Sequence, residues 1–257
     1  MESAFLGVPG VDAWLFTELA LASFATTMFG VIVGTAGGLV LLAIMAFIFP
    51  PAILLPVHTF IQLGAGASRA MLLWRYVLRP TVLPFALGAV IGAAAGARIF
   101  VSLPEGVLQG ILGAFILLVT WLPRFGRMGS ERNRFALLGL VSTFLGMFVS
   151  ATGTLVAPFV LSASPDRRNH VATLATLMSI VHITKLVAFA FLGIAIGAYL
   201  PLVVAMIATA ALGSWVGAMT LDRVPERAFR LILQTILTVL AVRLIWLAAE
   251  SAGLLRL

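Results

Sequence analysis

The sequence contains no cysteine, and few of its residues carry a charge. Without cysteine, the chain can form neither a disulfide nor a thiolate metal site. Charged residues make up only 10% of the 257 positions and hydrophobic residues 62%, with a mean hydropathy of +1.16. A water-soluble fold of this length could not hide so much apolar surface. The composition therefore predicts a membrane protein that crosses the bilayer several times.

Acidic residues are scarcer than basic ones. The chain holds 16 Lys and Arg against 9 Asp and Glu, which gives a net charge of +7. In a soluble protein this balance would suggest nucleic acid as a partner. Here the basic residues lie between apolar segments, where they indicate topology, so we expect a lipid bilayer and no nucleic acid. The residues before the first apolar run include Glu2 and Asp12 but no Lys or Arg, so we expect no cleaved signal peptide.

Two stretches of the chain are too long for a single membrane crossing. Leu19–Phe49 and Phe135–Pro165 each run 31 residues without a charged side chain, whereas a transmembrane helix needs about 20 residues. Each is interrupted near its middle by a patch of small residues, which is Gly34–Gly38 in the first stretch and Ser150–Thr154 in the second. A duplicated and broken hydrophobic segment indicates the binding site of a transporter.

The two halves of the sequence repeat one plan. The residues before the two patches match at an offset of 116, and the same offset aligns Arg69 with Lys185. Further along, an offset of 121 aligns Gly92-x-x-x-Gly96 with Gly213-x-x-x-Gly217, a spacing that permits close helix packing. We therefore predict two repeats. The first, residues 1–128, comprises a hairpin at 17–49 and helices at 57–78, 81–102 and 105–123; the second, residues 129–257, comprises a hairpin at 134–164 and helices at 169–196, 200–221 and 226–249.

The arginines discriminate between two ways of threading these eight segments. If all eight crossed the membrane, seven arginines would face one side and five the other, with residues 75–79 opposite residues 167–168. If the two long segments instead enter and return as hairpins, eleven arginines share one face and only Arg256 lies on the other. The second arrangement obeys the positive-inside rule. It predicts an all-α membrane protein with both termini outside and two inverted repeats, each a broken, re-entrant helical hairpin plus three transmembrane helices.

The patches supply the first group of predicted binding residues. The second arm of each hairpin would begin near Gly37 or Gly153. A helix N-terminus presents unpaired N–H groups and the positive end of the helix dipole, which suit an anion. The alternative is a pair of glycine kinks that serve only close packing. The predicted substrate-binding residues of the patches are Thr35 and Thr152, placed to cap the arms, together with Gly37, Gly38, Gly153 and Thr154.

Two basic residues lie deep within predicted crossings. Arg69 and Lys185 occupy equivalent positions of the two repeats, and no acidic residue lies deep in the membrane to neutralise them. A charge at the bilayer centre costs about 2.5–3.5 kcal/mol on insertion scales. An unpaired pair of cations beside two helix N-termini predicts a site for an anion. The alternative for Arg69 is that its side chain reaches back toward the loop that holds Arg75.

Histidines complete the predicted site. Gln62 follows His58 by one helical turn. His182 precedes Lys185 by three residues, so His182 and Lys185 share a helix face. We include His58, Gln62 and His182 among the substrate-binding residues; the alternative is that these histidines are hydrogen-bonded structural residues. No His-x-x-x-His spacing or carboxylate cluster occurs, so we expect no metal and no other cofactor. The sequence also lacks a Gly-x-Ser-x-Gly elbow, and we expect no enzymatic activity.

Several of these features resemble the sulfite exporter TauE/SafE family. They are the glycine-patched first segment, the proline-containing link Phe49–Pro56, the Gly88-x-x-x-Gly92-x-x-x-Gly96 crossing, and the repetition of the pattern after residue 134. The resemblance covers essentially the whole chain. It implies an inner-membrane transporter of sulfite, organosulfonates or related small organic anions. The sequence departs from many relatives in its shorter glycine run at Gly34–Gly38 and in having His58 where a small residue is common.

We therefore expect a transporter of the inner membrane that exports a small anion through a midplane site between two inverted repeats. Export gains about 2.3 kcal/mol per negative charge and 100 mV from an inside-negative potential. Two alternatives remain open: an anion channel of the same architecture, whose flux would not saturate, and a membrane-embedded enzyme or assembly subunit, which would copurify with a partner. The sequence also leaves open the identity of the anion, the direction and coupling of transport, and whether the chain forms a homo-oligomer.

Overall fold

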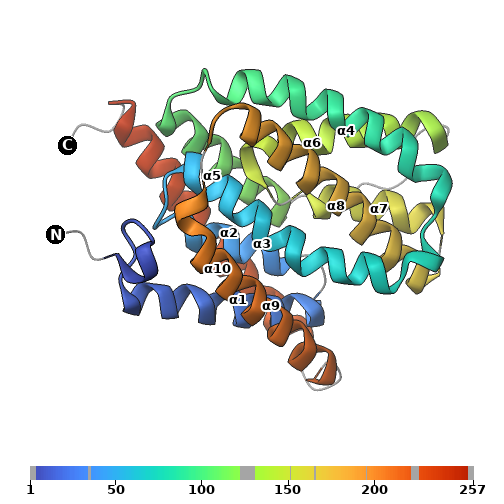
Figure 1. The fold of residues 1–257 in the computed structure, drawn as a ribbon, viewed down its shortest axis with the longest axis horizontal. Helices are drawn as coiled ribbons and strands as arrows, with labels where there is room; N and C mark the ends of the chain where they lie inside the picture. Colours follow the sequence, from blue (N-terminus) through green and yellow to red (C-terminus); the bar gives the residue numbers. More distant parts are fainter. Residues whose placement is uncertain are drawn as a thin grey trace. The chain divides into compact units, whose positions relative to one another are not determined.

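In a computed structural model, the described part of the chain is built from helices and short connections. The structure describes residues 4–33, 36–121, 131–150, 152–164, 166–194, 196–220 and 226–253. Within these ranges it contains no strand, so the predicted all-α class is confirmed. The α-helices (Figure 1) are α1 (Ala13–Val33), α2 (Ala36–Met45), α3 (Pro51–Leu72), α4 (Arg79–Phe100), α5 (Glu105–Trp121), α6 (Glu131–Val149), α7 (Gly153–Ala163), α8 (Arg167–Phe191), α9 (Leu200–Thr220) and α10 (Glu226–Ser251). The short 3-10 helices are η1 (Phe5–Gly7), η2 (Trp74–Tyr76) and η3 (Gly197–Tyr199).

Three helices are long and apolar enough to cross a membrane by length and composition, among the residues described. They are Arg79–Phe100, Arg168–Phe191 and Gly197–Gly217. These spans coincide with three of the predicted crossings, at 81–102, 169–196 and 200–221. The α8 helix begins two residues earlier than expected because the Asp166 carboxylate caps it, accepting hydrogen bonds from two backbone N–H groups.

The α3 helix differs from its predicted bounds of 57–78. It begins at Pro51 and includes the segment up to Pro56, which we expected to be a link. Proline is tolerated in the first turn of a helix, where its missing N–H would have no partner anyway, which suits Pro51; Pro56 lies inside the helix and leaves out one backbone hydrogen bond. At the other end the helix stops at Leu72, and the chain then forms η2.

Each of the two long uncharged stretches contains two helices. The first stretch holds most of α1 and all of α2, and the second holds most of α6 and all of α7. In the second stretch α6 ends at Val149, Ser150 has a positive φ of 54°, and α7 begins at Gly153. The corresponding residues Gly34 and Thr35 lie outside the described residues.

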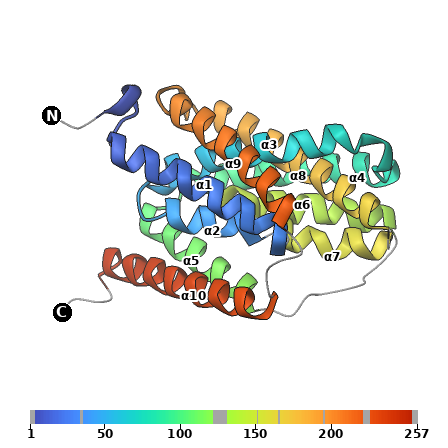
Figure 2. The same ribbon diagram turned by 90° about the horizontal axis from the view of Figure 1, so that it is seen from below.

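The chain divides into two compact units, and each takes helices from both halves of the sequence. The first unit comprises Met1–Ile61, Glu105–Trp121 and Ile194–Leu257. In this unit α1 packs along α9, and α5 lies beside α10 (Figure 2). The Ser23 hydroxyl on α1 donates a hydrogen bond of 2.8 Å to the backbone carbonyl of Met206 on α9.

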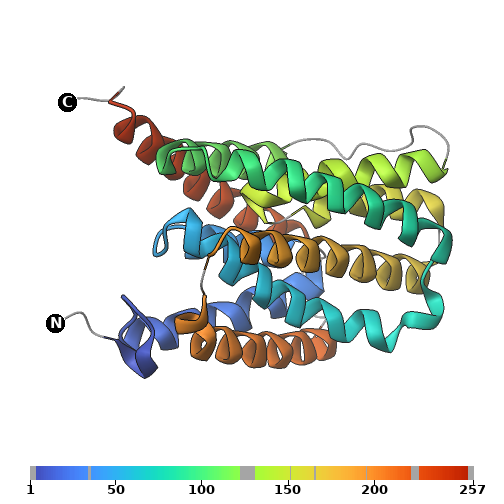
Figure 3. The same ribbon diagram turned by 45° about the horizontal axis from the view of Figure 1, so that its top comes forward.

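The second unit comprises Gln62–Pro104 and Leu122–Gly193. Here α4 packs along α6 (Figure 3), and α8 contacts α4, α6 and α7. The apolar core of this unit is shared by α4, α6, α7 and α8. Its buried residues are Phe85, Ala89, Phe135, Leu138, Val156, Val160, Leu177 and Val181.

Close helix contacts in both units involve equivalent glycines. A Cβ atom on Gly92 of α4 would meet the Leu140 carbonyl and lie 3.0 Å from the Phe144 nitrogen on α6. A Cβ atom on Gly213 of α9 would meet the Phe24 carbonyl and lie 3.2 Å from the Met28 nitrogen on α1. Gly213 is Gly92 plus 121, and Leu140 and Phe144 are Phe24 and Met28 plus 116. The same packing is therefore built twice, at the offsets read from the sequence, while the repeat boundary near residue 128 stays a prediction.

Candidate functional site

The connection between α6 and α7 has an irregular backbone inside an apolar region. The Ser150 N–H still donates to the Gly146 carbonyl at 3.0 Å, but Ser150 adopts the left-handed conformation. For a residue with a side chain, that conformation costs about 1–3 kcal/mol and persists only where the surroundings enforce it. Thr152 precedes α7, yet its side chain makes no capping hydrogen bond to the helix. Thr152 is therefore the N-cap residue of α7, as the sequence predicts, but its hydroxyl accepts no hydrogen bond from the backbone N–H groups of the helix.

Lys185 on α8 reaches this break. Its side chain is 0% exposed, and its Nζ donates a hydrogen bond of 2.8 Å to the Ser150 hydroxyl. The Nζ also lies 6.0 Å from the centroid of the Phe189 ring. Since lysine has no acceptor atoms, its ammonium group here faces one hydroxyl and an aromatic ring.

No carboxylate is close enough to neutralise Lys185 within this unit. The unit's acidic residues are Glu131 and Asp166, at the starts of α6 and α8. Asp166 is 19 residues from Lys185, which corresponds to about 28 Å along α8. Glu131 is 15 residues from Gly146, the α6 residue that faces Lys185, which corresponds to about 22 Å. The Lys185 charge is therefore unmatched by any protein anion in the described part of the unit.

Gly146 leaves room for the lysine. A Cβ atom at this position would lie 3.4 Å from the Lys185 Cδ and 3.7 Å from the Thr152 Oγ1. These are ordinary van der Waals distances, so Gly146 lies against both the lysine stem and the Thr152 side chain.

Hydroxyl groups near the break are buried without a hydrogen-bond partner. Thr152 is 1% exposed, and its Oγ1 has no partner among the described residues. The same holds for Thr154 Oγ1 in the first turn of α7, and also for Thr143 Oγ1, which lies on α6 seven residues before Ser150 and away from the break. A buried polar group left unpaired costs about 1–3 kcal/mol. The Lys185 region therefore combines an unneutralised cation with unused hydrogen-bonding capacity.

The second unit brings together several of the predicted binding residues. Lys185, Thr152, Gly153 and Thr154 lie at or next to the α6–α7 break, and Gly153 faces Met178 on α8, with a Cβ at Gly153 lying 3.5 Å from the sulfur. His182, one turn before Lys185 on α8, is buried. These residues come from α7, the residues just before it, and α8; their role in binding a substrate stays a prediction.

The first patch is described only in part. The buried His58 ring donates through Nε2 to the Gly38 carbonyl at 2.9 Å, which fits the structural alternative for this histidine. Gly37 packs against Gly30, and a Cβ atom added at Gly30 would lie 3.0 Å from the Gly37 Cα. Gln62 is partly buried one turn after His58. Two predicted residues cannot be placed: Thr35 and the side chain of Arg69 lie outside the described residues, so the pairing of Arg69 with Lys185 stays a prediction.

The sequence reasoning missed Ser150 and Gly146 as parts of the site. Both belong to the repeated motif around the second patch, so their positions carried a signal. What the motif did not reveal is the left-handed backbone at Ser150 and the contact with a lysine 35 residues away. Within the part of the chain that the structure describes, no group of three or more His, Cys, Asp or Glu side chains gathers that could hold a metal ion.

Comparison with known proteins gives one match. A family model described as "Sulfite exporter TauE/SafE" matches residues 19–244, which is nearly the whole chain. No curated protein and no solved structure matches the chain.

Proposed function

The chain belongs to the sulfite exporter TauE/SafE family, whose members are membrane transporters of sulfur-containing anions, and we propose that it exports such an anion through a site at the α6–α7 break. The proposed substrate is sulfite or an organosulfonate. The proposed location is the inner membrane, with both termini outside. Transport, rather than catalysis, is the activity of the family.

Lys185 is the observation that carries this proposal. A fully buried cation that has no carboxylate partner in the described part of its own unit is costly, and an anionic substrate would supply the missing charge. An ammonium group has three donors, and only one is used on Ser150. The Thr152 hydroxyl and the first N–H groups of α7 add donors of the kind that sulfite and sulfonate oxygens accept.

The re-entrant arrangement of the second long segment is supported by a contact at the end of the second unit. Arg168 Nη1 lies 3.0 Å from the Tyr76 hydroxyl, and the Leu78 N–H donates to the Thr173 hydroxyl at 2.9 Å. If all eight segments crossed, residues 75–79 and 167–168 would lie on opposite faces, separated by a hydrocarbon core of about 30 Å. Their contact favours a second segment that enters and returns on the same face.

A fold-back is also supported in the first long segment. A Cβ atom on Gly37 of α2 would meet the Thr26 carbonyl on α1. Eleven residues separate these positions, which is about 16 Å along a continuous helix. The contact requires α2 to return along α1, as a hairpin does. Together with the equivalent glycine contacts of α4–α6 and α9–α1, it favours two repeats of one plan, which we propose to be inverted.

Flux measurements on the purified protein in liposomes test the proposal. We expect saturable efflux of sulfite or an organosulfonate, strongly reduced in Lys185→Met and unchanged in Arg98→Gln, which removes an exposed arginine. Flux that does not saturate with substrate concentration would indicate an anion channel and not a transporter. No flux of any tested anion, together with a copurifying protein, would replace it with an assembly subunit.

A further inference from the structure

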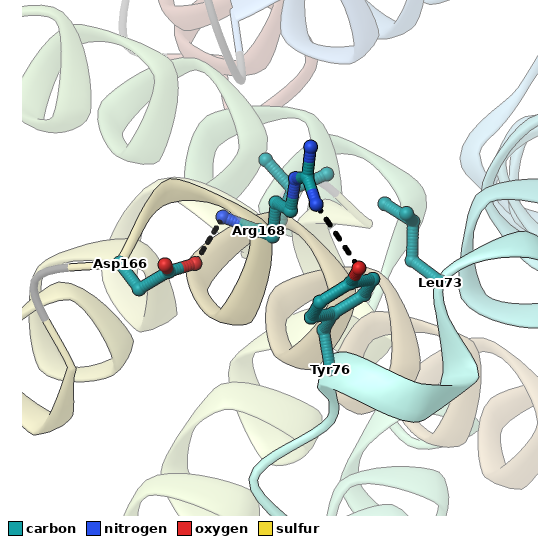
Figure 4. Close-up of a pocket in the computed structure, with 5 residues that line it drawn as sticks. Leu73, Tyr76, Asp166 and Arg168 are labelled. Atoms are coloured by element: carbon teal, nitrogen blue, oxygen red, sulfur yellow. Dashed lines mark hydrogen bonds between the residues drawn. The ribbon is translucent and has the colours of Figure 1, made fainter.

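A cavity of about 500 Å³ opens in the second unit, far along α8 from Lys185. It is lined by Leu73, Tyr76, Asp166, Arg168 and Val171, from the chain around η2 and the start of α8 (Figure 4). Its volume lies within the range of about 300–1,000 Å³ that is typical of small-ligand sites. Arg168 and Lys185 are 17 residues apart, or about 25 Å along the helix. The cavity is therefore separate from the proposed transport site.

Arg168 and Tyr76 form the polar wall of this cavity. The Arg168 Nη1 donates to the Tyr76 hydroxyl at 3.0 Å, and its guanidinium carbon lies 5.4 Å from the centroid of the Tyr76 ring (Figure 4). A guanidinium has five N–H donors in a planar fork that matches phosphate oxygens, so a single bond to Tyr76 leaves most of them for a ligand. Tyr76 thus holds the arginine in place without using up its donors.

The one carboxylate at the cavity is already engaged. Asp166 Oδ1 accepts hydrogen bonds of 2.8 and 3.0 Å from the backbone N–H groups of Arg168 and Asn169. Its negative charge therefore sits against the positive end of the α8 dipole, which reduces its repulsion of an anion.

Two more arginines lie close in the chain to the cavity-lining residues Leu73 and Tyr76 and share one aromatic ring. The guanidinium carbons of Arg75 and Arg79 lie 5.9 and 5.7 Å from the centroid of the Trp74 ring, and Trp74 immediately precedes Arg75 in η2. Among the described side chains of these two segments, Arg75, Arg79 and Arg168 outnumber the Asp166 carboxylate. All three arginine side chains are exposed and accessible to a ligand.

The three arginines and the two aromatic rings lie at the ends of apolar helices, which indicates their depth in the membrane. Two of the apolar spans begin at Arg79 and Arg168, so the cluster lies where these spans meet the membrane surface. Trp74 and Tyr76 are 54% and 38% exposed, and these amphipathic rings favour the headgroup region. Basic pockets at the ends of transmembrane helices attract anionic headgroups.

We propose that this cavity binds the phosphodiester headgroup of an anionic phospholipid. The Arg168 fork and the Arg75 and Arg79 side chains contact the phosphate oxygens. The apolar lining from Leu73 and Val171 takes the start of the glycerol and acyl region. A free phosphate ion would use the same donors but would have no need of the apolar wall or of the exposed aromatic rings.

Lipid binding to the detergent-purified full chain tests this site. The measurements are the shift in melting temperature and the dissociation constant for short-chain phosphatidylglycerol, phosphatidylcholine and inorganic phosphate. We expect phosphatidylglycerol alone to bind and stabilise the wild type. Each arginine removed near a membrane surface should weaken binding about fivefold. Arg75→Gln and Arg168→Gln should therefore each lose about that factor, and the double variant about 25-fold.

Arg98→Gln is the matched control, because Arg98 is an exposed arginine at the opposite end of α4 from Arg79. It makes the same charge change and should leave phosphatidylglycerol affinity unchanged. If Arg168→Gln destabilises the protein, the Arg75→Gln variant, which changes an exposed side chain stacked on Trp74, still decides the question. The proposal is overturned if affinity is the same in Arg75→Gln and wild type, if Arg98→Gln weakens binding equally, or if inorganic phosphate competes as well as the lipid does.

Discussion

Lys185 Nζ donates a 2.8 Å hydrogen bond to Ser150 Oγ, linking the middle of α8 to the break between α6 and α7. The lysine is fully buried, and its partner has the strained left-handed backbone. An apolar residue could fill the same space without the cost of burying a charge. The arrangement is therefore expensive for stability and is best explained by a role in binding an anion.

Replacing Lys185 with methionine should separate stability from transport. Methionine keeps the length of the side chain and removes the charge, and replacing a buried charge by an apolar residue is often neutral or stabilising. We expect the melting temperature to stay level or rise, while substrate affinity falls by about 1.5–3 kcal/mol, or roughly 10- to 150-fold. Thermal unfolding and binding of sulfite to the purified protein measure the two quantities. Unchanged affinity in Lys185→Met would reduce the lysine to a packing residue.

The Thr152 hydroxyl should behave as a substrate ligand. Thr152→Val keeps the shape of the side chain and removes a buried hydroxyl that has no hydrogen-bond partner among the described residues. We expect the variant to be as stable as wild type or more so, because a desolvated polar group is lost, but to bind substrate about fivefold or more weakly.

Thr143→Val is the matched control for this substitution. Thr143 has an equally buried and unpartnered hydroxyl on α6, seven residues and about 10 Å before Ser150. Thr143→Val should change stability alone. Equal affinities in the two valine variants would show that Thr152 does not touch the substrate.

The sequence predicts those features that depend on residues close together in the chain, and it predicts less well the contacts between residues far apart in the chain. The helical class, the apolar spans and the close packing at Gly92 and Gly213 follow from composition and spacing, which act locally or between helices of fixed geometry. The burial of Lys185 followed from its apolar surroundings. Its bond to Ser150 could not be predicted, because it requires a positive φ that serine rarely adopts and that only tertiary packing enforces. The cluster at Arg168 and Tyr76 joins residues 92 positions apart, and no periodic pattern records such a contact.

The proposed topology can be tested with single cysteines, since the chain has none of its own. We expect Arg75→Cys and Asp166→Cys to be protected from a membrane-impermeant thiol reagent in intact cells, and Ala52→Cys to be labelled. Asp166→Cys loses the α8 cap at a cost of about 1 kcal/mol, which a folded membrane protein tolerates. Labelling of position 166 together with protection of position 75 would restore the arrangement in which all eight segments cross.

The duplicated glycine packing predicts equal sensitivity at equivalent positions. In Gly92→Ala and Gly213→Ala the new methyl group would collide with a backbone carbonyl of the neighbouring helix, which cannot move as a side chain can. We expect both variants to lower the melting temperature by a similar amount, corresponding to about 1–3 kcal/mol of overpacking. Gly66→Ala is the control, because a Cβ atom there meets nothing within 4 Å and alanine favours a helix by about 1 kcal/mol. A drop at only one of the two packed glycines would argue against equivalent packing.

The last prediction concerns what drives transport. The acidic residues of the described helices lie within two turns of a helix end, and none is placed to carry protons through the middle of the membrane; they are Glu18, Glu105, Glu131, Glu226 and Glu250. Proton coupling would then depend on the histidines or on the buried Lys185, and the His58 ring already serves as a donor to the Gly38 carbonyl.

We therefore expect the membrane potential to be the main driving force. An inside-negative potential should accelerate anion efflux from liposomes without any pH gradient, because each negative charge that leaves gains about 2.3 kcal/mol per 100 mV. Glutamine can replace histidine as a hydrogen-bond donor but cannot titrate, so His58→Gln and His182→Gln should keep this response even where their substrate affinity falls. Efflux that ignores the potential, follows a pH gradient, and loses that dependence in either variant would instead establish histidine-mediated proton coupling.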